Sequence, residues 1–363
     1  MRATLSTAVA AWLLLSTGAS GQISAQECRG RAGAIGVSRV IEIDTASGPL
    51  FGMQYKESDL LQPGEIVLTF DDGPLRPYTQ PVLDALTAHC TKATFFSVGR
   101  MAVSDPEMVK EIVRRGHTLG AHTWTHRNLK TLVPHRAIAE IELGFSAVRQ
   151  AAGVPIAPFF RFPYLSDPKA MIAHLQGRGM AIFSIDADSY DYRTRNAGEV
   201  HSTILKQLAA KGKGIVLFHD IQPSTARALA ALLGDLKARG FRVVHLVPKS
   251  SVETLSDYDA MAEQELAKKR AAGARPLAKR ALVWPIAPAP GQSEPGVPAT
   301  PEAAGTAAKP PARGSDRTRS LRNSSAQEPT EPRPDQTEPA ETAERPVARQ
   351  FDGDTWRVRV FSK

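Results

Sequence analysis

The chain has 363 residues, of which 42% are hydrophobic, and its formal net charge is +8 at pH 7. This composition can supply the core of one large domain or two medium ones. A basic balance suits nucleic acid, an anionic membrane surface or acidic glycans. The sequence contains no basic run with interleaved aromatic residues, so nucleic acid is not expected as a partner.

Residues 1–25 resemble a secretory signal peptide. Arg2 supplies a positive charge, residues 8–15 form an apolar core too short to span a bilayer, and small residues follow. We expect cleavage between Ala19 and Gln26, export to the periplasm or the outside of the cell, and no stable membrane insertion afterwards. An uncleaved anchor is the alternative. In such a compartment Cys28 and Cys90 either form a disulfide or stay separate thiols, and both alternatives stand.

Residues 26–65 are expected to form an N-terminal extension that packs on the main domain. Two β-type runs within it, Arg39–Ile43 and Leu50–Tyr55, are interpreted as a strand pair. At the other end, residues 251–272 favour a polar helix. Residues 273–346 hold 14 of the chain's 27 prolines and few apolar residues, which predicts a disordered linker. Residues 347–363 then form a short tail, either a strand or a docking segment.

The main domain is expected over residues 66–250, where apolar β-type runs alternate with helical patterns. Asp105-Pro106 and Asp167-Pro168 each give a helix start signal, and amphipathic patterns cover 135–152 and 224–239. Seven alternations predict parallel strands joined by crossover helices, and they favour a closed or nearly closed (β/α) barrel over an open doubly wound sheet. The expected strands are 66–70, 93–98, 117–121, 158–161, 181–185, 214–218 and 241–247.

Two groups of polar residues have the pattern of a metal site. His122 and His126 are four residues apart, a spacing that puts both imidazoles on one face of a helical turn and suits zinc. Asp71 and Asp72 end the first strand of the domain. Adjacent side chains on an extended chain point in different directions, so one acid can bind a metal while the other faces a substrate. An ordinary Asp-Gly turn and two unrelated histidines are the alternative.

Further polar residues follow the later strands. Arg161 can orient a carboxylate through a two-pronged hydrogen bond, and His219 is well placed to act as a general acid. Asp186, Asp188 and Asp191 crowd one loop, where at least one is expected to form a turn or cap a helix. All of these residues follow expected strands, and barrel enzymes build their active sites at that end.

The ordered motifs TFDDGP, HTWTH, RFPY, DSYDY and LFH resemble the polysaccharide deacetylase family, which is the NodB-homology group and carbohydrate esterase family four. The resemblance covers about residues 66–247. It implies an α/β fold with a distorted (β/α)7 barrel and a divalent metal, commonly zinc, with cobalt as the alternative. It also implies a hydrolase that removes N-acetyl groups from an N-acetylglucosamine polymer such as peptidoglycan, a chitin-like chain or poly-N-acetylglucosamine. A catalytically silent glycan-binding protein on the same barrel is the alternative.

The resemblance also implies roles for individual residues. Tyr192 stands where the family usually has Trp, and Lys92 stands where it often has Arg. Aromatic faces for sugar rings are expected from Trp124, Tyr164, Tyr190 and Tyr192. By this resemblance, Asp72, His122 and His126 would bind the metal. Asp71 would be the general base, oriented by Arg161, and His219 the general acid, tuned by Asp188. The Tyr164 N–H would contact the oxyanion, and Leu217 would form a wall of the acetyl pocket.

Overall fold

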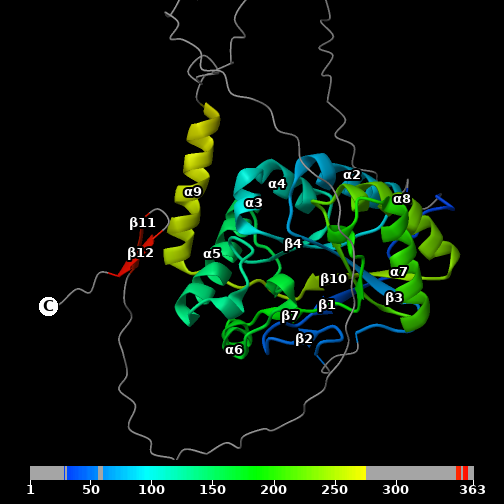
Figure 1. Ribbon diagram of the computed structural model, residues 1–363, viewed down its shortest axis with the longest axis horizontal. Coiled ribbons are helices and arrows are strands. Elements are labelled where there is room, and N and C mark those ends of the chain that lie inside the picture. Colours follow the sequence, from blue (N-terminus) through cyan, green and yellow to red (C-terminus); the bar gives the residue numbers. More distant parts are fainter. Residues whose placement is uncertain (1–27, 29–30, 56–59, 275–348, 353–354, 359–363) are drawn as a thin grey trace, which may run out of the picture. The chain divides into compact units, whose positions relative to one another are not determined.

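The computed structural model describes residues 28, 31–55, 60–274, 349–352 and 355–358 (Figure 1). The expected signal peptide and nearly all of the expected proline-rich linker lie outside these residues. The chain divides into two compact units, Met1–Trp284 and Pro285–Lys363. The described part of the second unit is an antiparallel pair of short strands, β11 (Arg349–Asp352) and β12 (Thr355–Val358). None of the described helices is both long and apolar enough to cross a membrane.

The first unit is built on a parallel sheet that curls into a distorted barrel, as the sequence predicts (Figure 1). From β3 the sheet continues in the order β4, β5, β6, β7 and β2, each strand paired with the one before it. On the other side of β3, β9 pairs with β3 and with β8. The strands are β1 (Arg39–Ile43), β2 (Leu50–Phe51), β3 (Glu65–Asp71), β4 (Thr94–Ser97), β5 (Thr118–Ala121), β6 (Phe159–Phe160), β7 (Ala181–Phe183), β8 (Ala187–Asp188), β9 (Gly214–His219) and β10 (Arg242–Pro248).

Helices connect the successive parallel strands. The two predicted helix starts differ in outcome: Asp105 caps α4 by accepting from the Met108 N–H, whereas α6 has Pro168 at its N-cap and no side-chain cap. The Asp167 carboxylate instead lies close to the Tyr55 hydroxyl. Burial raises the pKa of Tyr55, and the charge and hydrogen bond of Asp167 raise it further. The helices are α2 (Arg76–Ala88), α3 (Gly99–Ser104), α4 (Pro106–Arg114), α5 (Pro134–Ala152), α6 (Lys169–Gly177), α7 (Ala197–Lys211), α8 (Pro223–Ala238) and α9 (Ser256–Ala274), with 3₁₀ turns η1 (Leu129–Thr131), η2 (Pro163–Leu165) and η3 (Asp191–Arg193).

The expected pairing of the two N-terminal strands is wrong. β1 pairs with β10, in parallel register from Arg39 opposite Val244, and β2 pairs with β7. Each strand therefore adds to a different edge of the main sheet instead of forming a hairpin. The two pairings are long-range in sequence, and a local run of β-type residues carries no information about them.

The interior of the barrel is filled by aromatic and aliphatic side chains. Phe183 packs against Phe96 and Phe159, with ring centroids 5.7 and 4.9 Å apart. The Arg161 guanidinium covers the Phe96 ring at 4.4 Å, so the apolar filling ends directly beneath the polar residues that follow the strands. This packing gives those residues a rigid floor.

Helix α9 is part of the first unit, so the boundary predicted at residue 250 is too early. Its Ala262 and Leu266 are buried in a cluster with Trp124, Val103 and Leu143. The polar helix expected over 251–272 is thus a helix over Ser256–Ala274, and its Ala262 and Leu266 side chains pack on the barrel domain. A protein truncated near residue 250 would lose the contacts made by Ala262 and Leu266 and would expose the ring of Trp124.

We expect Leu266→Ala to lower the free energy of unfolding by about 2–5 kcal/mol, because it empties a buried site in the α9 contact. Lys269→Ala, at an exposed position of the same helix, is the control and should change it by less than about 0.5 kcal/mol. Urea unfolding of both variants measures the effect. Equal stability of the two variants would show that α9 does not pack on the barrel.

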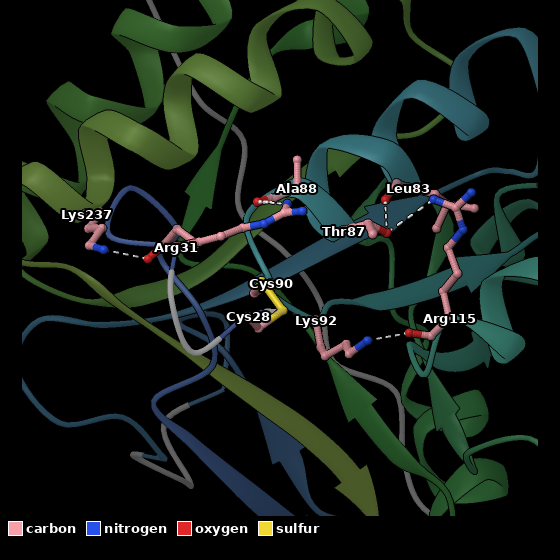
Figure 2. Close-up of a disulfide and its surroundings, with 10 residues drawn as sticks. Cys28, Arg31, Leu83, Thr87, Ala88, Cys90, Lys92, Arg115 and Lys237 are labelled. Atoms are coloured by element: carbon pink, nitrogen blue, oxygen red, sulfur yellow. Dashed lines mark hydrogen bonds between the residues drawn. A yellow bond between two sulfur atoms is a disulfide. The ribbon is translucent and has the colours of Figure 1, made fainter. Parts of the chain in front are cut away.

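A disulfide joins Cys28 to Cys90 and attaches the N-terminal extension to the barrel (Figure 2). Nearby, the Arg31 guanidinium donates to Ala88 O at 3.2 Å. Lys92, one of the two residues that depart from the family pattern, donates to Arg115 O at 2.5 Å. It precedes β4 and so lies at the N-terminal end of the barrel, away from the polar residues that follow the strands.

Replacing both cysteines with serine should lower the free energy of unfolding by about 2–4 kcal/mol, because the bridge closes a loop of 62 residues. Chemical denaturation measures this loss. Thiol titration of the denatured, unreduced protein should find neither Cys28 nor Cys90 free. Two titratable thiols would refute the pairing.

Candidate active site

Four strands bring polar side chains to one end of the barrel. Asp71 closes β3, opposite His219 of β9 on one side and Phe96 of β4 on the other. His122 follows β5, and Arg161 follows β6, whose Phe160 pairs with Ala121. The carboxyl ends of the parallel strands therefore gather the predicted residues around one point, as expected of a barrel enzyme.

Asp72, His122 and His126 form a group that can hold a metal ion. Their nearest ligand atoms all lie within 4.8 Å of one another. Asp72 Oδ1 is 3.5 Å from His122 Nε2 and 3.2 Å from His126 Nε2. The expected helical turn is absent: residues 122–126 form a loop with positive φ at Thr123 (65°) and His126 (60°). The Thr123 hydroxyl fixes this loop by accepting from the His126 N–H at 3.0 Å.

The donor set fits a divalent metal. His122 Nδ1 lies 2.7 Å from Arg161 O and donates to it, which leaves the Nε2 lone pair facing Asp72. Burial lowers the pKa of His122 to about 3, so the ring is neutral, as a ligand must be. Asp72 Oδ1 is buried and has no hydrogen-bond partner. Two imidazole nitrogens and one carboxylate oxygen are the ligands of a catalytic zinc site with open positions.

Asp71 is buried beside these ligands and is oriented by Arg161. Arg161 Nη1 donates to Asp71 Oδ1 at 2.7 Å. The predicted two-pronged contact is not formed, because other donors of this guanidinium are directed to Thr69 Oγ1, Phe183 O and Ser184 O. The second carboxylate oxygen, Oδ2, faces the candidate metal ligands and lies 3.8 Å from His122 Nε2. Burial raises the pKa of Asp71 and the Arg161 charge opposes that rise, an environment that suits a base.

His219 is held by Asp191, not by Asp188 as the resemblance implied. His219 Nδ1 donates to Asp191 Oδ1 at 2.6 Å, and the His219 backbone N–H donates to Oδ2 at 2.7 Å. The Thr225 hydroxyl of α8 also donates to Oδ2. Burial alone would lower the pKa of His219. The bond and charge of Asp191, together with the charges of Asp72 and Asp71, outweigh burial and raise the pKa to about 9. The ring is therefore protonated at neutral pH.

Asp188 and Asp186 have structural roles in the same loop. Asp188 Oδ1 accepts from the Tyr190 N–H at 2.9 Å, and its Oδ2 accepts from the Tyr192 hydroxyl at 3.2 Å. Asp186 Oδ2 accepts from the Ile215 N–H at 2.7 Å and ties the loop to β9. The contact of Asp188 with the Tyr190 N–H is the turn-forming role expected of at least one acid in this loop.

Three of the four predicted aromatic faces lie at the rim of the site. Tyr164, Tyr190 and Tyr192 are exposed, and the Tyr192 ring stands edge-on to His219 with centroids 5.6 Å apart. The Tyr164 ring stands in the same way against His126, at 4.8 Å. Trp124 is only 9% exposed because α9 covers it, so its predicted role as a sugar-binding face is wrong.

Two further residues support the site. Leu217 is buried two residues before His219 on β9, so both side chains project on the same face of the strand. Asp220, which the motifs did not single out, accepts from the Gly73 N–H at 3.0 Å and from the Thr79 hydroxyl at 2.6 Å. A Cβ at Gly73 would lie 2.0 Å from this carboxylate, so only glycine fits. Asp220 thus fixes the loop that carries Asp72.

Comparison with known proteins identifies the family. The sequence model described as polysaccharide deacetylase matches residues 61–183. The chain is 31% identical over 215 residues to a chitooligosaccharide deacetylase of Bradyrhizobium sp., covering 55% of this chain and 97% of that protein. The chain belongs to the polysaccharide deacetylase family. Its curated relatives are named as deacetylases, and the chain is accordingly a polysaccharide N-deacetylase, a hydrolase of amide bonds.

Other relatives extend the range of substrates named in this family. A peptidoglycan-N-acetylglucosamine deacetylase of Listeria monocytogenes is 35% identical over 179 residues, covering 49% of this chain but only 37% of that protein. A chitin deacetylase of Colletotrichum lindemuthianum is 34% identical, covering 50% of this chain and 78% of that protein. Among solved structures, a peptidoglycan deacetylase of Bdellovibrio bacteriovorus matches with a TM-score of 0.55 and 32% identity, covering 61% of each chain. This last match supports the distorted barrel.

Proposed function

We propose that this polysaccharide deacetylase is a metal-dependent enzyme that removes N-acetyl groups from N-acetylglucosamine units, giving acetate and a free amine. One observation carries the proposal. The group Asp72, His122 and His126 lies beside two hydrogen-bonded pairs, Asp71 with Arg161 and His219 with Asp191. Hydrolysis of an amide needs an activated water and a protonated leaving group, and this arrangement supplies residues for both.

Each residue then has a defined task. A divalent metal on Asp72, His122 and His126 would supply Lewis acidity to the acetamide carbonyl and to water. Asp71 accepts the proton of the attacking water while Arg161 holds its carboxylate in place. His219 donates its Nε2 proton to the departing nitrogen, because an amide nitrogen leaves only as the amine. Asp191 keeps that imidazole protonated and correctly turned.

The remaining predicted residues surround the acetyl group and the sugar. The Tyr164 N–H is proposed to stabilise the oxyanion, and Leu217 to line the acetyl pocket. Tyr164, Tyr190 and Tyr192 present exposed rings at the rim, where sugar rings can stack. A catalytically silent protein is disfavoured, because such a protein needs neither a buried carboxylate aligned by Arg161 nor a histidine held protonated by Asp191.

We rank peptidoglycan first as the substrate, chitin-like or poly-N-acetylglucosamine chains second, and non-sugar amides a distant third. The net charge of +8 favours an anionic polymer, although salt weakens this preference. The N-terminal signal pattern and the Cys28–Cys90 bridge support export to a compartment where such polymers occur. Zinc is the metal that suits two histidines and an aspartate best, with cobalt as the alternative.

The test is acetate release from purified peptidoglycan, chitooligosaccharides and a non-sugar amide, measured side by side with added zinc or cobalt. We expect release from at least one glycan and greater release from peptidoglycan. Turnover of the non-sugar amide alone would refute the glycan assignment. Turnover of chitooligosaccharides alone would reverse the ranking and leave the mechanism intact.

The ligand assignment predicts that His126→Ala loses bound metal, because only two of the three protein ligands remain. Elemental analysis of the wild-type protein should find about one zinc per chain after equilibration with zinc and desalting. His135→Ala, at a histidine of α5 outside the group, is the matched control and should keep the metal. Full metal content in the His126 variant would remove it from the ligand set.

A further inference from the structure

The Arg193 guanidinium lies at the rim of the site and has no role in the mechanism above. It is exposed, and its Cζ lies 4.8 Å from the Tyr190 ring centroid and 5.3 Å from the Tyr192 ring centroid. The two rings meet edge to face at 71°, with centroids 6.2 Å apart. The guanidinium thus occupies the corner between two exposed tyrosines.

This corner is one aromatic ring away from the proposed general acid. The Tyr192 ring that contacts Arg193 also stands edge-on to His219, with centroids 5.6 Å apart. A polymer that presents one acetamide to His219 must continue across the rim on one side or the other. A sugar close to the reacting one can therefore come within reach of Arg193.

The loop that carries Arg193 is held in place by hydrogen bonds of its two aspartates. Asp191 is fully buried and is bound to His219 and Thr225, and Asp188 holds the Tyr190 N–H and the Tyr192 hydroxyl. The Arg193 N–H donates to Tyr190 O at 2.9 Å. Because the loop and the Tyr192 ring are held before substrate arrives, the position of the guanidinium is defined at little further entropic cost.

Within the described part of the chain, no carboxylate lies at ion-pair distance from Arg193. Two further exposed arginines extend the positive surface, and Arg227 Nη2 donates to Arg195 O at 2.5 Å. Besides these ring contacts, the Arg193 guanidinium forms a hydrogen bond with the Tyr192 side chain. A guanidinium carries five N–H donors, so this bond leaves others for a ligand. Those donors match a planar carboxylate.

We propose that Arg193 binds a carboxylate of the glycan substrate and so makes the enzyme prefer strands that carry one near the reacting N-acetylglucosamine. The inference rests on the proposed deacetylase function and adds a specificity-determining residue to it. In peptidoglycan the carboxylate has two sources. It belongs to the lactyl group of the alternate sugar when the strand is free of peptide, and to the stem peptide when that group is amide-linked.

The test compares kcat/KM for acetate release by the wild-type enzyme, Arg193→Gln, Arg193→Lys and Arg195→Gln on three substrates. These are intact soluble peptidoglycan fragments, the same strands stripped of peptide by an amidase, and neutral chitooligosaccharides. Arg193→Gln should lose about three- to tenfold in kcat/KM, through KM, on at least one of the two carboxylate-bearing substrates, and nothing on chitooligosaccharides. Arg193→Lys should fall between, because an ammonium keeps the charge but lacks the fork.

The substrate that shows the loss identifies the carboxylate: peptide-free strands indicate the lactyl group, and intact fragments indicate the stem peptide. An equal loss on neutral chitooligosaccharides would overturn the proposal, as would an equal loss in Arg195→Gln, which would indicate general charge attraction. An unchanged substrate ratio in Arg193→Gln would overturn it too, with the deacetylase function intact. A wild-type enzyme that releases no acetate from any glycan would instead refute the proposed function itself.

Discussion

Asp71→Asn should lower kcat for acetate release by about 10²- to 10⁴-fold while the protein keeps its metal and its fold. The amide has the shape of the carboxylate and its oxygen still accepts from Arg161 Nη1 at the Oδ1 position. It cannot take a proton from water at neutral pH. The loss should therefore appear in kcat, and the melting temperature should change little.

The matched variant is Asp72→Ala, one residue further along the loop. Asp72 belongs to the metal group, so this variant should lose both metal and turnover, whereas Asp71→Asn loses turnover alone. Metal analysis and steady-state kinetics on the same preparations separate the two roles. Near-normal turnover in Asp71→Asn would place the base on another residue.

Asp191→Asn is expected to have the second large effect, about 10²-fold or more on kcat. Asp191 is a positioning residue: it turns His219 and holds it protonated, with a pKa raised to about 9 against the opposing effect of burial. Without this charge the pKa of His219 falls. An acid is lost as pH rises through its pKa, so the alkaline limb of kcat should move to lower pH. A purely structural role would lower activity without moving that limb.

Asp188→Asn provides the comparison within the same loop. Its carboxylate holds the Tyr190 N–H and the Tyr192 hydroxyl, and Asp191 is the residue that bonds His219, so we expect a loss of only a fewfold and an unmoved alkaline limb. A larger effect from Asp188→Asn than from Asp191→Asn would restore the assignment that the motif suggested.

This pair of acids shows where sequence reasoning reached its limit. Both aspartates stand in the five-residue stretch DSYDY, and either is close enough in sequence to serve His219. The choice is made by Tyr190, whose positive φ of 51° reverses the chain, and by Thr225, which comes from α8 to bind Asp191. Neither the turn nor the partner from α8 is encoded in the local pattern.

The barrel itself could be predicted because its signals are local. Each strand is a short apolar run. Asp71 and His219 end such runs and His122 and Arg161 directly follow them, so the shared end of a parallel sheet brings them together. The pairing of β1 with β10 and the burial of Trp124 beneath α9 could not be predicted, since both depend on segments more than a hundred residues away.

The most direct test of the central claim is a product balance on one defined chitooligosaccharide. The protein is first freed of metal with a chelator, then assayed before and after one equivalent of zinc is restored, with Asp71→Asn in parallel. We predict that the zinc-restored wild-type enzyme releases acetate and free amine in equal amounts. The chelated enzyme and the zinc-restored Asp71→Asn variant should release both products far more slowly. Equal release by the chelated enzyme, or by zinc-restored Asp71→Asn, would contradict the account.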